Sequence, residues 1–85
     1  MNSHYSMVIQ WCDVDQAFLV TLPEFTNVKM PCTHGKTYEE AARHGAEVIE
    51  SLLEIIQEKN RPLPEPRLFH FEDEEIENEV SSSPT

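Results

Sequence analysis

The chain has 85 residues, which is enough for one small domain with a single hydrophobic core. Its formal net charge of −10 argues against nucleic acid as a direct partner, because phosphate binding requires a basic surface. No stretch approaches the ~20 apolar residues of a membrane span, and the first residues lack the basic and then apolar layout of a signal peptide. Cys12 and Cys32 are too few for a disulfide framework and are expected to be free thiols. We therefore expect a soluble, cytoplasmic protein.

The first part of the chain predicts a β-hairpin and a short third strand. Residues 5–11 place apolar side chains at alternate positions, and residues 17–22 do the same. The polar, Asp-rich residues 12–16 between them suit a hairpin loop. Pro23 ends the second strand because proline cannot donate to a strand ladder. A third strand is expected over residues 28–30, before Pro31.

A long amphipathic helix is predicted between Thr37 and Lys59. The Thr37 hydroxyl is a suitable N-cap, and Glu40 can reach back to the N–H of Thr37, which would complete a capping box. Gly35 suits a turn that needs a positive φ. Apolar or small residues recur in steps of three and four along one face. They are Ala41, Ala42, Gly45, Val48, Ile49, Leu52, Ile55 and Ile56.

The last part of the chain predicts an extended connection, a strand and a tail. Three prolines within residues 60–66 exclude a continued helix. Residues 67–71 have the composition of a final strand. Residues 72–85 begin with a run of acids, which predicts a disordered acidic tail. This tail has two interpretations: a solvated chain end, or a mimic of RNA that attracts a basic protein.

These elements together predict an α+β fold over residues 1–71, a β-β-β-α-β two-layer sandwich in which the helix covers one face of the sheet. Val8 and Leu19 would remain on the uncovered face or at an edge. Apolar remainders of this kind usually mark an association surface. We therefore expect a homodimer or homo-tetramer.

Several short motifs follow one another in a fixed order between residues 5 and 66. They are Tyr5-x-x-x-Ile9-x-Trp11, Asp15, Leu22-Pro23-Glu24-Phe25, Thr33-x-Gly35-x-Thr37-x-x-Glu40-Ala41, Val48-Ile49-x-x-Leu52 and Leu63-Pro64-x-Pro66. In this combination the chain resembles the HicB antitoxin family, over roughly residues 5–71. The resemblance implies a partial ribonuclease-H-like fold. It also implies that the protein binds and neutralises HicA, a small basic toxin that cleaves messenger RNA.

The chain departs from the family pattern at three places. The residues after Phe71 are acidic and too few for the DNA-binding domain that many HicB proteins carry, so operator binding is not expected. Residues 27–32 form a longer link than usual, and Lys36 stands where an acid is common. We expect the toxin to contact exposed acids and aromatics of the loops, with attraction from the tail. The candidate residues are Asp13, Asp15, Glu24, Phe25, Glu72, Asp73, Glu74 and Glu75.

The sequence also contains residues that could belong to a two-metal nuclease, a zinc site or a Cys–His nucleophile. Asp13 and Asp15, with Glu39 or Glu47, could serve a two-metal nuclease, but a solvated loop explains the two aspartates and the helix dipole explains Glu39. A zinc site would need a second close ligand pair besides Cys32 and His34, and a Cys–His nucleophile would need an orienting third group. The other zinc candidates are Cys12, His44 and His70, and nothing in the sequence supplies the third group. We expect no enzyme activity, metal or cofactor. The alternative function is an orphan oligomerising or regulatory domain without a toxin.

Overall fold

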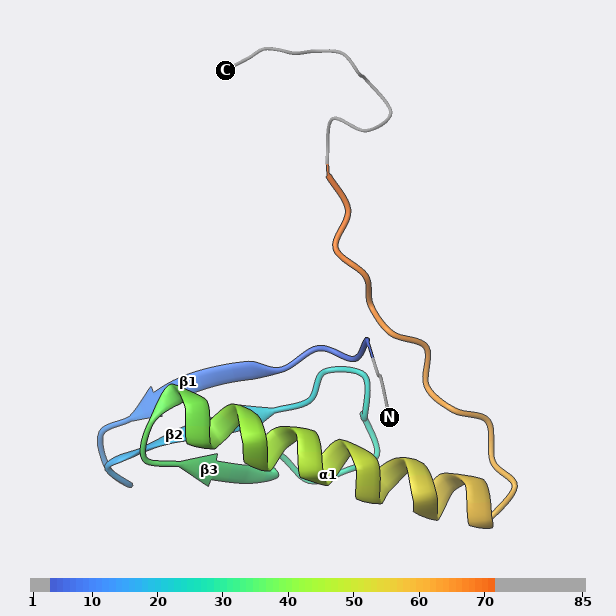
Figure 1. The fold of residues 1–85 in the computed structure, drawn as a ribbon, viewed down its shortest axis with the longest axis horizontal. Coiled ribbons are helices and arrows are strands. Elements are labelled where there is room, and N and C mark those ends of the chain that lie inside the picture. Colours follow the sequence, from blue (N-terminus) through green and yellow to red (C-terminus); the bar gives the residue numbers. More distant parts are fainter. Residues whose placement is uncertain (1–3, 72–85) are drawn as a thin grey trace.

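A computed structural model describes residues 4–71 as one long helix that covers one face of a small sheet (Figure 1). In chain order the elements are β1 (Val8–Cys12), β2 (Ala17–Thr21), β3 (Thr33–Gly35) and α1 (Tyr38–Glu58). The sheet is antiparallel, with the order β1-β2-β3. The predicted α+β architecture of three strands followed by a helix is confirmed. In the described part of the chain, no helix is both long and apolar enough to cross a membrane.

The β1–β2 hairpin forms where the alternation predicted it. The strands pair from Val8 with Thr21 to Cys12 with Ala17. Cys12 therefore belongs to β1, and the loop is one residue shorter than expected, over 13–16. Gln16 adopts a positive φ of 53° at the end of this loop, and its side-chain amide donates to the Asp13 carbonyl at 2.7 Å.

The third strand lies later in the chain than predicted. Residues 28–30 lie in an irregular segment with turns and bends, and β3 begins only at Thr33. The difference arises because Val28 and Met30 turn toward the core and pack against it, partly buried. The strand ladder resumes when the Cys32 N–H donates to the Val20 carbonyl at 3.0 Å.

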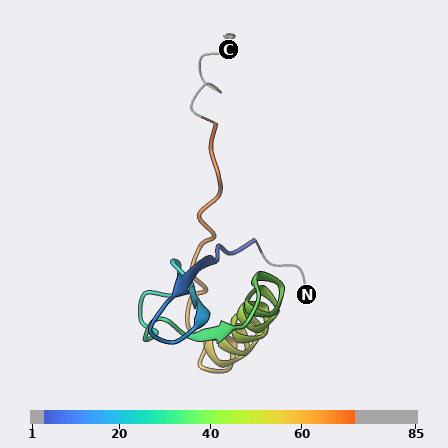
Figure 2. The ribbon, with the colours of Figure 1, turned by 90° about the vertical axis from the view of Figure 1, so that its left-hand side faces the viewer.

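The predicted fourth strand is absent from the described residues. Residues 67–71 are exposed and pair with no strand. They follow a segment that Tyr5 holds through a hydrogen bond from its hydroxyl to the Pro64 carbonyl at 2.6 Å. From there the chain runs away from the sheet, as both views show (Figure 1 and Figure 2). The two-layer sandwich therefore has β-β-β-α order within residues 4–71. The predicted acidic tail, 72–85, lies outside the described residues.

The core lies between α1 and the helix-facing side of the sheet (Figure 2). Val20 and Leu22 are its largest fully buried side chains. The buried helix residues occur at every fourth position and are Ala41, Gly45, Ile49 and Leu53. Leu53 is buried although it was not in the predicted stripe, whereas Ile55 is exposed.

The helix N-terminus contains the predicted cap with a different partner for Glu40. The Thr37 hydroxyl accepts a hydrogen bond from the Glu40 N–H at 3.0 Å. The Glu40 carboxylate accepts from the Lys36 N–H rather than from Thr37, and this bond holds the pKa of Glu40 below its ordinary value. The positive φ expected for Gly35 is wrong, since the residue is extended within β3. Glycine is required there because a Cβ atom would lie 2.7 Å from the Ala41 Cα.

Candidate protein-interaction site

Three aromatic rings gather at the end of the β1–β2 hairpin. The sheet register places Trp11 of β1 opposite Phe18 of β2, and their ring centroids lie 5.1 Å apart in an edge-to-face arrangement. Tyr38, the first residue of α1, lies with its ring centroid 4.3 Å from that of Phe18. Trp11 is 48% exposed and Tyr38 is 67% exposed. Large aromatic side chains that remain accessible in this way are typical of protein-binding surfaces.

The hairpin loop adds carboxylates to the same end of the molecule. Asp13 and Asp15 are both exposed in the loop, and Val14 between them is 91% exposed. The Trp11 indole N–H donates to an Asp13 carboxylate oxygen at 3.2 Å, which connects the acids to the aromatic rings. We call this surface the hairpin-tip site, and its residues are Trp11, Asp13, Val14, Asp15, Phe18 and Tyr38.

The exposure expected for two candidate toxin-binding residues is wrong. Phe25 is only 4% exposed and belongs to the core, where its ring centroid lies 5.0 Å from that of Tyr5. Glu24 is only 7% exposed. The turn after β2, in which the Phe25 N–H donates to the Leu22 carbonyl, directs both side chains inward. The tail candidates Glu72, Asp73, Glu74 and Glu75 lie outside the described residues.

Glu24 acts instead as a buried anchor between the two ends of the described chain. Its carboxylate accepts hydrogen bonds from the Ser6 N–H at 3.1 Å, the Ser6 hydroxyl at 3.0 Å and the Arg67 N–H at 2.7 Å. Burial raises the pKa of Glu24, but the hydrogen bonds from Arg67 and Ser6 lower it, and the net pKa lies below its ordinary value. The charged form is therefore the one that the fold stabilises.

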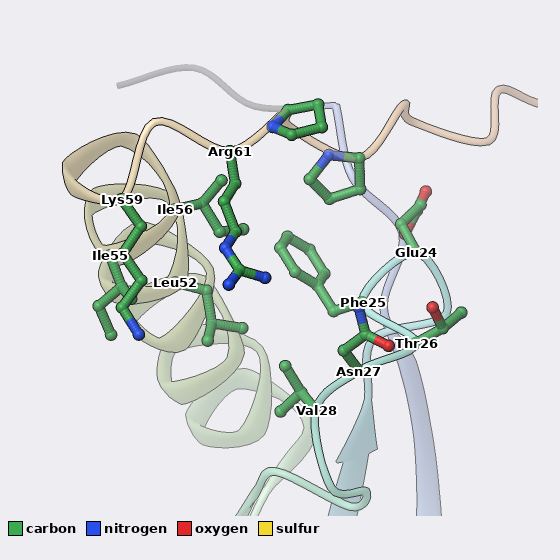
Figure 3. Close-up of a pocket in the computed structure, with 12 residues that line it drawn as sticks. Glu24, Phe25, Thr26, Asn27, Val28, Leu52, Ile55, Ile56, Lys59 and Arg61 are labelled. Carbon is green, nitrogen blue, oxygen red and sulfur yellow. The ribbon is translucent and has the colours of Figure 1, made fainter.

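A groove of about 410 Å³ lies between the C-terminal half of α1, the loop after β2 and the proline-rich segment (Figure 3). Its walls are mostly apolar, with Phe25 on one side and Leu52 on the other. Lys59 and Arg61 add positive charge, and Figure 3 shows the Arg61 guanidinium between the two walls. No sequence pattern indicates the groove, because the three segments meet only in the folded chain.

The residues considered for a metal site or a nucleophile do not form one cluster within the described residues. Within residues 4–71, no three His, Cys, Asp or Glu side chains gather as a potential metal site. Burial raises the pKa of the Cys32 thiol, and its sulfur lies 3.6 Å from the Val20 carbonyl oxygen. His44 Nδ1 lies 2.6 Å from the His34 carbonyl oxygen, which connects α1 to β3. Glu47 forms an exposed ion pair with Arg43 at 3.9 Å.

Comparison with known proteins found no match among family models, curated proteins or solved structures. The HicB resemblance therefore stays a prediction from the ordered motifs.

Proposed function

We propose that this protein is a HicB-like antitoxin or regulatory protein that binds and neutralises a small basic, HicA-like toxin that cleaves messenger RNA. The observation that carries the proposal is the hairpin-tip site, where exposed Trp11 and Tyr38 lie at the same end of the molecule as Asp13 and Asp15. Tryptophan and tyrosine are among the residues that most often dominate binding energy at interfaces. Acids at the rim of such a surface favour a basic partner.

Inhibition in this proposal requires no chemistry from the antitoxin itself. The carboxylates of Asp13 and Asp15 would face the cations with which a ribonuclease holds RNA phosphates, and the rings of Trp11 and Tyr38 would exclude water from the contact. RNA would then be unable to reach the toxin. The same proposal includes a partial ribonuclease-H-like fold, assembly as a homodimer or homo-tetramer, and a cytoplasmic location.

Co-expression tests the proposal directly. The chain is expressed with a small basic HicA-like protein encoded beside its gene, and growth, complex formation and the dissociation constant are measured. We expect rescue of growth and a stable complex, and we expect Trp11→Ala to raise Kd about 30-fold, which corresponds to about 2 kcal/mol.

The matched control is Ile55→Ala, because Ile55 is a similarly exposed apolar residue on α1, away from the hairpin tip. Its Kd should remain within about twofold of the unmodified chain. Circular dichroism verifies that both variants are folded. Neither complex nor rescue, or equal Kd values for the two variants, would overturn the proposal.

One observation favours the alternative of an orphan oligomerising or regulatory domain. Residues 67–71 expose apolar side chains and pair with no strand of the described sheet, as expected for a segment used in self-association. Persistent self-association without binding to a neighbouring toxin would favour this alternative.

A further inference from the structure

Within residues 4–71, no strand covers the outer edge of β1. β1 is the end strand in the order β1-β2-β3, so only one of its sides is paired within the described residues. An end strand presents backbone N–H and C=O groups that can accept another strand. Ile9 on the helix-facing side is only half-buried there, and Val8 on the other side is exposed. This edge therefore offers both backbone hydrogen bonds and apolar contact.

The chain also carries a segment with the properties of a missing strand. Residues 67–71, which we call the C-terminal arm, contain three apolar residues in five, and all three are exposed: Leu68, Phe69 and Phe71. In an extended chain Phe69 and Phe71 share one face. Their ring centroids lie 4.9 Å apart, and Phe69 is 79% exposed. A single copy thus leaves both rings largely in water, which is unfavourable.

The arm is held in a position that directs it away from its own sheet. Its first residue, Arg67, donates to the buried Glu24 carboxylate, which also accepts from Ser6 just before β1. The preceding residues 62–66 include three prolines, which stiffen the segment. Figures 1 and 2 show the arm projecting from the body of the molecule. An arm that follows a stiff segment and projects outward is better placed to reach a second copy than to fold back on β1.

We infer that the C-terminal arm of one copy adds as a fourth strand to the open edge of β1 in a second copy. Phe69 and Phe71 would then extend the helix-covered face beside Ile9, and His70 would lie on the opposite face beside Gln10. The exchange is reciprocal in a twofold dimer, because each copy offers one arm and one edge. With His70 opposite Gln10, one of the two rings also lies beside Trp11 of the hairpin-tip site. The exchange is nevertheless measurable with the purified chain alone, so its test does not require a toxin.

Disulfide trapping separates exchange between copies from pairing within one copy. The full chain is prepared with Cys12→Ser and Cys32→Ser, and two tagged versions carry Gln10→Cys or His70→Cys. Mild oxidation of the mixture should join the two tags in one covalent dimer. As a control, Glu50→Cys, exposed on α1, should give little product with His70→Cys. If a chain with both Gln10→Cys and His70→Cys closes on itself and remains a monomer, the inference is overturned.

Sedimentation of the purified full chain provides an independent measurement. We expect a dimer at micromolar concentration, and we expect the double change Phe69→Ser and Phe71→Ser to raise the dimer Kd on the order of tenfold or more. Ile55→Ser, on α1, should leave the Kd unchanged. The exchange is contradicted if the unmodified chain is a monomer, or if the loss of both rings leaves the dimer Kd unchanged. Both outcomes can be read without a toxin, so they are separate from the test of the proposed function.

Discussion

Glu24 is a residue whose structural role is visible only in the folded chain. In the sequence it is one acid among sixteen, next to a proline and at a turn. In the structure its carboxylate is buried and accepts hydrogen bonds from Ser6 and Arg67, residues that are far apart in the chain. A buried charge is tolerated only when it is hydrogen-bonded in this way. Glu24 therefore stabilises the junction between the start of the sheet and the C-terminal arm.

Replacement of Glu24 should test this role. Glu24→Gln keeps the shape but removes the charge and places amide hydrogens near donors, so we expect a loss of about 1–3 kcal/mol in the free energy of unfolding at neutral pH. Urea unfolding measures the loss. Glu65→Gln removes the same charge from an exposed side chain and should change stability by less than about 0.5 kcal/mol. Equal effects of the two variants would contradict the anchor role.

The same residue predicts a pH dependence. Because the folded pKa of Glu24 is lowered, its contribution is fully present above the ordinary value of 4.5 and is lost as the pH falls through the folded pKa. The difference in unfolding free energy between the unmodified chain and Glu24→Gln should therefore shrink below pH 4.5. A difference that stays constant to strongly acidic pH would show that the carboxylate is not preferentially charged in the fold.

The two glycines differ in what a side chain would meet. At Gly35 a Cβ atom would lie 2.7 Å from the Ala41 Cα, which is backbone and cannot move alone. At Gly45 the nearest atom is the Met7 sulfur, at the end of a flexible side chain. We expect Gly35→Ala to cost about 1–3 kcal/mol. Gly45→Ala should cost less, because about 1 kcal/mol of helix propensity offsets the crowding. Thermal unfolding of both variants measures the order, and the reverse order would contradict this account.

At the scale of single elements, α1 depends on its first turn. The Thr37 hydroxyl accepts from the Glu40 N–H, one of the backbone donors that the helix itself cannot satisfy. Thr37→Ala should lower the free energy of unfolding by about 1 kcal/mol. Thr26→Ala, in an exposed loop, is the matched control and should have little effect. If the two variants unfold at the same denaturant concentration, the cap does not contribute to stability.

At the scale of the whole molecule, the net charge of −10 should affect the rate of association with a basic protein, most strongly through acids at the binding surface. Asp13→Asn with Asp15→Asn should slow association with the proposed basic toxin roughly three- to tenfold at low salt, with little change in fold stability. The effect should diminish as salt rises, because screening shortens the range of exposed charges. Glu50→Gln with Glu54→Gln makes the same charge change on α1. Stopped-flow association rates compare the pairs, and equal slowing would indicate only a net-charge effect.

The hairpin and the helix could be predicted because their signals are local. Alternation over residues 5–11 and the cap at Thr37 act within a few residues of the chain, so neighbours in sequence are sufficient. The third strand was placed too early because residues 28–30 have strand composition, yet the turn after β2 directs them to the core. The predicted strand over 67–71 finds no partner in the described residues, because pairing depends on an edge at the other end of the chain.

The candidate site divides in the same way. Asp13 and Asp15 were expected at the surface because a polar loop between two strands normally lies in solvent. Trp11 belongs to the predicted apolar alternation of residues 5–11, which does not distinguish a buried ring from an exposed one, and no sequence pattern singles out Tyr38. Burial and exposure at these positions depend on where α1 begins over the sheet, which no local pattern specifies.

The sequence alone determined the strand–strand–strand–helix order, the cap of the helix and the acidic character of the chain. Each of these depends on spacing between near neighbours or on composition. Only the tertiary structure decided that Glu24 and Phe25 are buried, that the aromatic rings gather at the hairpin tip, and that the C-terminal arm leaves the edge of β1 open. The physical reason is that burial and strand pairing depend on contacts between segments distant in the chain. These contacts contribute free energy only when the segments meet in the folded state.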